Sequence, residues 1–437
     1  MSEQVRVIEV DPMARVEGEG SLHVRVSDGE VRDVELRIFE PPRFFEAFLR
    51  GRAYTEPPDI TARICGICPV AYQMSSCWAI EDACGVAVPG HVREFRRLLY
   101  CGEWIESHAL HIYLLHAPDF LGYPSAIALA ADHPELVERG LRLKAAGNAL
   151  MSLVGGRAVH PVNVRVGGFY RLPTADEVAA IRPALEQALE DALETLRTVA
   201  GLPFPDLEQP YPYLALVTDD GYPLEAGTLA TSTGQRWPVA EFLDHVREEH
   251  VARSNALHAT LDGEAYVVGP LARFSINRDR LSPLAAEAAS SAGLGDTCRN
   301  PFRSIVVRAV ELVYAVEEAL RLLDAWAPGL PASVPVAPRA GVGHGASEAP
   351  RGLLYHRYRL DDDGTIEDAV IVPPTSQNLA GMEADLTRFL QRHLDLPYDE
   401  MQLRCEQAVR NYDPCISCAT HALRLTVEDV SPGSARS

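Results

Sequence analysis

The sequence of 437 residues predicts an α+β protein that is mainly helical. Apolar residues at helical spacing recur through the body of the chain. The alternation of apolar and polar residues that is typical of strands is found at the N-terminus and again over residues 353–372. The 47% hydrophobic content is ample for a large buried core. Because the sequence has no Ser/Gly-rich linker, internal repeat or low-complexity run, we expect one packed unit over residues 1–421.

The predicted strands form two hairpins. Near the N-terminus, VRVIEV is followed by SLHVRV and EVRDVELRIF, and the turn between the last two contains Asp28 and Gly29, a pair that favours tight turns. Leu353–Leu360 and Ile366–Val372 flank the turn sequence DDDG. The N-terminal part is therefore predicted to be β, with a smaller β excursion late in the chain.

Four segments have the apolar spacing of helices. They are Val92–His116, which is predicted to close at Pro118, Asp176–Ala200, Phe302–Trp326 and Asp399–Arg410. The last helix must stop before Pro414, because the residue preceding a proline disfavours the α region. That boundary places Cys415 on a loop.

Charge and targeting signals exclude several classes of protein. Lys and Arg number 40 against 61 Asp and Glu, and a chain with a net charge of −21 should repel nucleic acid. The N-terminus lacks a basic segment followed by an apolar one, and no stretch reaches eighteen uninterrupted apolar residues. We therefore expect a cytoplasmic protein without a membrane span, whose partner is a protein or a small substrate.

Two Cys-x-x-Cys motifs are the strongest chemical signal. The chain has nine cysteines, an odd number without a signal peptide, which favours reduced thiols over a disulfide framework. Cys65 and Cys68 lie near the start and Cys415 and Cys418 near the end, so only the fold can bring the pairs together. Four such thiolates bind zinc, iron-sulfur clusters, nickel or iron, and a redox disulfide at each motif is a further alternative.

The residues around the two motifs resemble a known family. The first pair stands in RICGIC and is preceded by RVEG, and the second pair stands in DPCISCATH. Between them lie SHALHIYLLHAPDF, GRAVHP, SEAPRG and VPPTSQN, in that order. In this combination the chain resembles the large subunits of nickel-iron hydrogenases. The variant ICGICPVAYQM is most similar to the soluble NAD(P)-linked or sulfhydrogenase-type group. The resemblance implies reversible cleavage of H2 into protons and electrons.

The resemblance also implies the ligands of the metal centre. Cys65 and Cys415 would be terminal ligands of nickel. Cys68 and Cys418 would bridge nickel to an iron that carries two cyanides and one carbon monoxide. The alternatives are a four-cysteine zinc site in an interaction protein, and a metal-free relative such as the related subunit of respiratory complex I.

A magnesium ion is implied near the C-terminus. Glu46 and His421 match the family's magnesium-binding side chains, and the third ligand is a backbone carbonyl that we place at Val370. A hard cation that keeps several waters needs only a few protein ligands. Without the resemblance, Glu46 would be taken for a solvated surface acid and His421 for a polar tail residue.

The catalytic residues are implied in the same way. Arg351 resembles the arginine that hangs over the open metal position, with Asp119 and Asp413 as the carboxylates that fix it. Ordinary salt bridges are the alternative for these three residues. Cys415 would act as the base, and Glu17 would carry protons away from it, unless Glu17 simply caps a turn.

Four residues are implied to line the cofactor: Pro350, Arg351, Pro373 and Thr375. The chain departs from the family pattern at two positions. Tyr72 stands where many relatives have a histidine that supports a bridging sulfur. Pro374 stands where a Ser or Thr often donates to a cyanide, which leaves Thr375 or Ser376 as the donor.

The resemblance finally implies partners and processing. Electrons must leave through an iron-sulfur small subunit, and flavin and iron-sulfur diaphorase subunits would complete the path to NAD(P). Nickel chaperones would assist metal insertion. A maturation endopeptidase would then remove residues 422–437.

Overall fold

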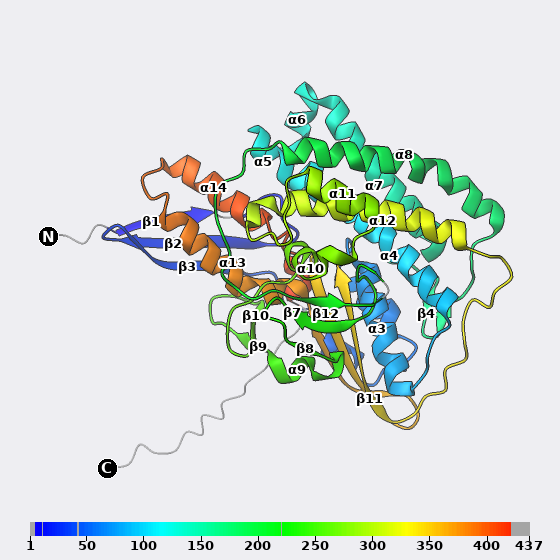
Figure 1. Cartoon of the computed structure of the whole chain (residues 1–437). Helices are drawn as coiled ribbons and strands as arrows, with labels where there is room; N and C mark the ends of the chain where they lie inside the picture. Colours follow the sequence, from blue (N-terminus) through cyan, green and yellow to red (C-terminus); the bar gives the residue numbers. More distant parts are fainter. Residues whose placement is uncertain (1–4, 11, 42, 220, 421–437) are drawn as a thin grey trace, which may run out of the picture.

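The computed structural model describes residues 5–10, 12–41, 43–219 and 221–420. Over these residues the chain forms an α+β fold in which long helices pack around small antiparallel sheets (Figure 1). The predicted, mainly helical fold class is confirmed. Within the described part of the chain, no helix has both the length and the apolar character that crossing a membrane requires.

Three antiparallel strands form the N-terminal sheet: β1 (Val5–Val10), β2 (Gly20–Ser27) and β3 (Glu30–Ile38). Asp28 and Gly29 form the turn between β2 and β3, and both have positive φ, at 53° and 76°. The predicted hairpin is confirmed. The C-terminal helices cover this sheet (Figure 1), since α13 (Pro374–Gln391) packs against β3 and α14 (Tyr398–Arg410) against β1.

Five long helices form the body: α3 (Pro69–Cys84), α4 (Gly90–Leu110), α7 (Pro134–Gly155), α8 (Ala175–Ala200) and α12 (Ser304–Ala325). α4 packs against α7 and α12, and α12 packs against α8 (Figure 1). The predicted closure at Pro118 is wrong. α4 continues through a π-helix, η2 (His111–His116), into α5 (Ala117–Leu121), because proline is tolerated in the first turn of a helix.

Shorter elements connect these units. The helices are α1 (Phe45–Leu49), α2 (Pro57–Thr61), η1 (Ala62–Ile64), α6 (Ala126–Asp132), α9 (Phe242–His245), α10 (Pro270–Asn277), α11 (Pro283–Ser291) and α15 (Ile416–Ala419). The strands are β4 (Val164–Arg165), β5 (Gly168–Phe169), β6 (Leu214–Val217), β7 (Thr228–Thr231), β8 (Arg236–Trp237), β9 (Val246–His250) and β10 (Leu257–Leu261).

A second three-stranded sheet contains β11 (Gly341–Ala349), β12 (Gly352–Leu360) and β13 (Ile366–Val372). β12 and β13 are the second predicted hairpin. The glycine-rich β11 is an additional strand, and α3 packs directly on it. A Cβ atom at Gly343 would lie 2.0 Å from the carbonyl oxygen of Ala79 and 2.3 Å from the nitrogen of Ala83. This close contact joins the helix that follows the first cysteine motif to the β11–β12 hairpin.

We expect Gly343→Ala to destabilise the protein, because the backbone of α3 leaves no space for the added methyl group. Overpacking of this kind costs about 1–3 kcal/mol or more. Thermal and urea denaturation of the purified chain measure the effect. Gly90→Ala is the matched control, since Gly90 is exposed and an added Cβ atom meets nothing within 4 Å. Equal denaturation midpoints for the two variants would contradict the tight packing of α3 on β11.

Candidate metal centre

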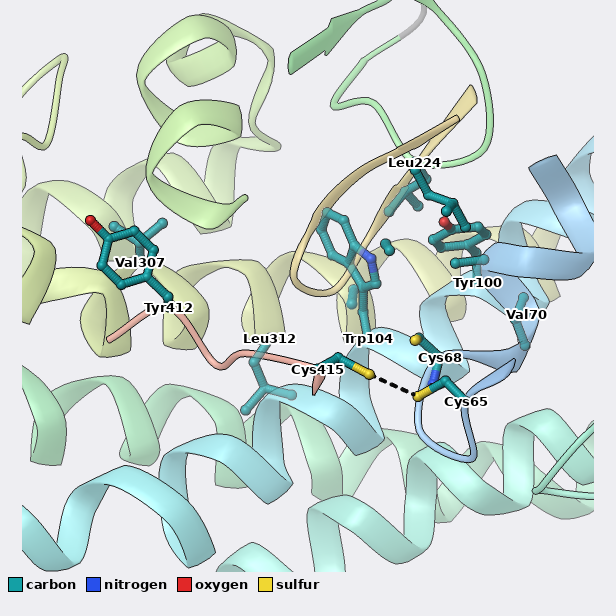
Figure 2. Close-up of a cluster of buried hydrophobic side chains, with 14 of the residues drawn as sticks. Cys65, Cys68, Val70, Tyr100, Trp104, Leu224, Val307, Leu312, Tyr412 and Cys415 are labelled. Atoms are coloured by element: carbon teal, nitrogen blue, oxygen red, sulfur yellow. Dashed lines mark hydrogen bonds between the residues drawn. The ribbon is translucent and has the colours of Figure 1, made fainter. Parts of the chain in front are cut away.

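Four cysteines from the two ends of the chain meet in the interior. Sγ of Cys65 lies 3.4 Å from Sγ of Cys415, and Sγ of Cys68 lies 3.7 Å from Sγ of Cys418. All four sulfur atoms lie within 4.8 Å of one another, and each cysteine is at most 3% exposed. Figure 2 shows Cys415 facing the loop that carries Cys65 and Cys68. The predicted meeting of the two motifs is confirmed.

Hydrogen bonds to the backbone hold both motifs in place. Sγ of Cys65 accepts from the N–H groups of Ile67 and Cys68, at 3.3 Å and 3.4 Å. Cys415 lies between α14 and α15, which agrees with the predicted loop position. Its N–H donates to the hydroxyl oxygen of Thr375 at 2.9 Å. The positions of the sulfur atoms are therefore fixed by the protein itself.

Glu103 supports the first motif, and the sequence patterns did not reveal it. Cys68 is the N-cap residue of α3, but its side chain makes no capping hydrogen bond. The carboxylate of Glu103 in α4 accepts instead from the N–H groups of Val70 and Ala71, at 2.6 Å and 3.1 Å. A carboxylate at this position satisfies free N–H groups and complements the helix dipole. The sulfur of Cys68 thus remains available for a metal.

The thiols differ in acidity. A hydrogen bond from the thiol of Cys415 lowers the pKa of Cys65. Burial raises the pKa of Cys415 and the pKa of Cys418. Metals bind the thiolate form, so an entering ion must displace the remaining protons. Four buried sulfur donors of this kind suit nickel, iron or zinc.

Glu17 lies beside Cys415. Its Oε2 atom is 3.1 Å from Sγ of Cys415 and accepts from the N–H of Ser417 at 3.0 Å. The backbone carbonyl of Glu17 also accepts from the N–H of Ile416 at 2.9 Å. Glu17 is partly exposed, so its carboxylate connects the buried thiol with the protein surface.

Arg351 lies in the turn between β11 and β12 and is 2% exposed. Its Nε donates to the carbonyl oxygen of Asp413 at 2.7 Å, and its Nη2 donates to the carboxylate of Asp413 at 3.2 Å. Burial opposes the charge of Arg351, but the carboxylate of Asp413 raises its pKa above the ordinary value. A buried positive charge therefore lies close to the cysteines.

Asp119 does not pair with Arg351 as expected, and this expectation is wrong. The carboxylate of Asp119 accepts from Nη1 of Arg410 at 2.9 Å and 3.0 Å, and it also pairs with Arg15. Nε of Arg410 donates to the carbonyl oxygen of Ala14 at 3.0 Å. Asp119 therefore links the N-terminal segment to the end of α14. Two arginines from distant parts of the chain determine this pairing, and no local sequence pattern reveals it.

Two of the three expected magnesium ligands lie on elements that pack against each other, Glu46 in α1 and Val370 in β13. Oε1 of Glu46 accepts from the N–H of Ile371 at 2.7 Å. That N–H belongs to the same peptide group as the carbonyl of Val370, and the two point to opposite sides of the strand because the peptide is trans. His421 lies outside the described residues.

The residues expected to line the cofactor lie on segments next to the cysteines. Pro350 precedes Arg351 in the hairpin turn, and Pro373 is the N-cap residue of α13. Of the two candidate donors after Pro374, Ser376 donates its hydroxyl hydrogen to Glu248 at 2.6 Å. Thr375 accepts a hydrogen bond from Cys415 and keeps its own hydroxyl hydrogen.

Tyr72 is buried close to Cys418. Burial raises the pKa of Tyr72 well above its ordinary value. The residue that replaces the histidine of many relatives is therefore a neutral phenol.

Comparisons with known proteins agree with this arrangement. The model of the nickel-dependent hydrogenase family matches residues 43–138 and 260–421. Sulfhydrogenase 1 subunit alpha of Pyrococcus furiosus is 35% identical over 428 residues, which cover 96% of this chain and 98% of that protein. NAD-reducing hydrogenase HoxS subunit beta of Cupriavidus necator is 29% identical over 471 residues, which cover 96% of this chain and 95% of that protein.

Solved structures show the same fold. An NAD+-reducing [NiFe]-hydrogenase in the H2-reduced state superimposes with a TM-score of 0.86 and 28% identity, over 95% of this chain and 99% of that one. The [NiFeSe]-hydrogenase of Dm. baculatum gives a TM-score of 0.77 at 25% identity, over 96% of this chain and 100% of that one. The chain therefore belongs to the nickel-dependent hydrogenase family, as a large catalytic subunit of the nickel-iron type that acts on H2.

Proposed function

We propose that the four cysteines hold a nickel ion and an iron ion. Cys65 and Cys415 are the terminal ligands of nickel, and Cys68 and Cys418 bridge the two metals. The meeting of all four sulfur atoms within 4.8 Å of one another supports this assignment, and the roles of the individual cysteines follow from the resemblance of the motifs. A structural zinc site would use the same donors but would have no need of a buried guanidinium beside them.

The iron carries two cyanides and one carbon monoxide in this proposal. Nη1 of Arg351 is a buried donor without a hydrogen-bond acceptor among the described residues. Thr375 retains a hydroxyl hydrogen next to Cys415. Both groups have a hydrogen to donate to the ligands of the iron. Side chains around a metal centre commonly form hydrogen bonds with the ligands of the metal. Pro350 and Pro373 supply the apolar part of the lining.

The residues around the cysteines provide the route for the proton. When bound, the metals would polarise H2 and take up the electron pair of its bond, which a side chain alone cannot do because H2 is a very weak acid. Sγ of Cys415 then holds the proton, and Oε2 of Glu17, 3.1 Å away, receives it and carries it outwards. Arg351, fixed by Asp413, keeps a positive charge beside the reacting atoms.

A magnesium ion is proposed at the peptide group between Val370 and Ile371. Its ligands are the carboxylate of Glu46, the carbonyl of Val370 and the side chain of His421. The hydrogen bond from Ile371 to Glu46 supports the placement of the carboxylate beside β13, and the two remaining ligands follow from the resemblance of the motifs. Oxygen ligands are those that magnesium prefers.

An iron-sulfur small subunit receives the electrons. Three exposed apolar residues lie on one segment close to the first cysteine motif: Val159, Val162 and Tyr170. His160 in this segment forms a hydrogen bond of 2.7 Å with the carbonyl of Ala62, three residues before Cys65. Exposed apolar residues that gather in this way mark protein interfaces. We assign this surface to the small subunit.

The electrons continue through flavin and iron-sulfur diaphorase subunits to NAD(P) in the cytoplasm. The similarity to the NAD-reducing hydrogenase of Cupriavidus necator supports this acceptor. Nickel chaperones deliver the metal before a maturation endopeptidase removes residues 422–437, which lie outside the described residues.

Cys68→Ser is expected to lose nickel and iron together, because a bridging thiolate holds both ions. Elemental analysis and the infrared bands of carbon monoxide and cyanide are measured on enzyme purified with its small subunit. Cys77→Ser is the control, since Cys77 lies outside the metal-binding group and burial raises its pKa to about 12. A normal infrared spectrum in Cys68→Ser would refute the bridging role, and zinc in place of nickel in the wild type would overturn the metal assignment.

Glu17→Gln is expected to keep its metals but to block proton exit. Glutamine is nearly isosteric with glutamate but cannot alternate between acid and base forms. Exchange of D2 with solvent protons, followed by mass spectrometry at matched nickel and iron content, should fall by roughly a hundredfold to ten-thousandfold. Glu19→Gln, an exposed acid two residues away, should exchange at the wild-type rate. Wild-type exchange in Glu17→Gln would mean that the proton leaves by another route.

Residues 422–437 are expected to be absent from the active enzyme. The intact mass of the large subunit, measured after nickel insertion, should correspond to a chain that ends at His421. Protein from cells grown without nickel is the control and should keep the full length. A full-length chain in fully active enzyme would show that no such cleavage occurs.

A further inference from the structure

The backbone that carries Arg351 is held by a second buried arginine, Arg273 of α10. Arg273 is 0% exposed. Its guanidinium donates to the carbonyl oxygens of Ala349 and Pro350, at 2.6 Å and 3.0 Å. These are the two peptide groups directly before Arg351. Two buried carboxylates, those of Glu311 and Glu348, also accept from it.

The hydrogen-bonding capacity of Arg273 is fully used. Nε and Nη2 donate to the two carboxylate oxygens of Glu311 at 2.9 Å and 2.8 Å, and Nη1 donates to Glu348 at 3.1 Å. Together with the two carbonyl oxygens, these acceptors match the five N–H groups that a guanidinium offers. A lysine has three donors on one atom and cannot reproduce this planar pattern.

The turn that Arg273 holds is short. Ala349 pairs with Gly352 across the β11–β12 hairpin, so Pro350 and Arg351 form a two-residue tip. Helix α10 approaches the tip closely, because a Cβ atom at Gly269 would lie 2.6 Å from the carbonyl oxygen of Arg351. The start of α10 thus contacts one side of the turn, and Arg273, one helical turn later, binds the other two carbonyls.

Arg273 is itself held firmly. Its guanidinium lies over the ring of Trp104, 4.5 Å from the centroid, and Nε1 of Trp104 donates to the carbonyl of Glu348 at 2.9 Å. Glu311 also accepts from the hydroxyl of Tyr222 at 2.8 Å. Figure 2 shows Trp104 among the buried side chains drawn with the cysteines. Arg273 therefore has little freedom to move.

We propose that Arg273 is a positioning residue for Arg351, an inference that rests on the proposed role of Arg351 beside the metals. Asp413 fixes the side chain of Arg351, and Arg273 fixes the backbone from which that side chain extends. Both ends must be held, because a displacement of about 1 Å in a reacting group can cost on the order of a hundredfold in rate. Arg273 touches neither substrate nor metal and acts only through the hairpin tip.

The test is a double-mutant cycle between Arg273→Lys and Arg351→Lys. In the enzyme purified with its small subunit, Arg273→Lys should lower H2-dependent turnover per nickel by roughly tenfold to a hundredfold. The nickel and iron contents should stay at wild-type values. In the Arg351→Lys background, Arg273→Lys should cause no further loss. Arg96→Lys is the control, since Arg96 is also fully buried, pairs with Glu81 at 2.8 Å and should keep wild-type turnover.

A second readout does not depend on turnover. Hydrogen exchange, measured by mass spectrometry on the whole complex, should be faster in a peptide over residues 345–355 of Arg273→Lys and unchanged in that of Arg96→Lys. Unchanged exchange at the hairpin tip would overturn the proposal. If Arg273→Lys fails to mature, Glu311→Gln replaces it, because this change weakens the hold on Arg273 without contacting the tip.

The outcomes separate the two levels of the inference. If Arg351→Lys has wild-type turnover, the proposed role of Arg351 fails, and the positioning role of Arg273 fails with it. Arg351→Lys is compared with the double variant. If Arg351→Lys has low turnover, and adding Arg273→Lys lowers that turnover by the same factor as in the wild type, only the positioning role of Arg273 is overturned. The positioning role of Arg273 is supported if Arg273→Lys lowers turnover in the wild type but not in the Arg351→Lys background, and if hydrogen exchange at the hairpin tip is faster.

Discussion

Two pairs of thiols from opposite ends of the chain meet in the buried interior, and the packing of the fold depends on this meeting. Cys65 and Cys415 are separated by most of the sequence, yet their sulfur atoms lie 3.4 Å apart. The ends are joined by backbone pairing, because the carbonyl of Glu17 accepts from the N–H of Ile416. Glu17 and Cys415 are thus placed side by side by the same contact that joins the two ends of the chain.

Features with local causes could be predicted from the sequence. The Asp28–Gly29 turn, the helix over 176–200 and the loop position of Cys415 each follow from steric or periodic rules that act within a few residues. The cysteine motifs and the residues around them also identified the family, since chemistry restricts the residue types that can serve a metal. The meeting of the four cysteines could therefore be predicted from the two motifs.

Features that depend on distant partners could not be predicted. The expected partner of Asp119 was Arg351, but Arg410 and Arg15 reach its carboxylate instead. Glu103 caps α3 from another helix, and Arg273 holds a hairpin that lies far away in the sequence. Each of these side chains is ionisable and buried, and such a group is costly to desolvate and is kept where it fixes a geometry. A sequence pattern shows that an ionisable residue stands in an apolar segment. It does not show which distant residue that side chain binds.

The π-helix η2 shows how a local irregularity contributes to the site. A π-helical turn holds more residues than an α-helical one and changes the faces on which the following side chains lie. His111, the first residue of the π-helix, and Asp119, in the helix that follows it, both bind Arg410. The ring of His111 lies 2.7 Å from the carbonyl oxygen of Arg410, and Asp119 binds its guanidinium. Arg410 is three residues before Asp413, the carboxylate that holds Arg351. The irregular helix thus fixes the start of the segment that delivers both Asp413 and Cys415 to the metal centre.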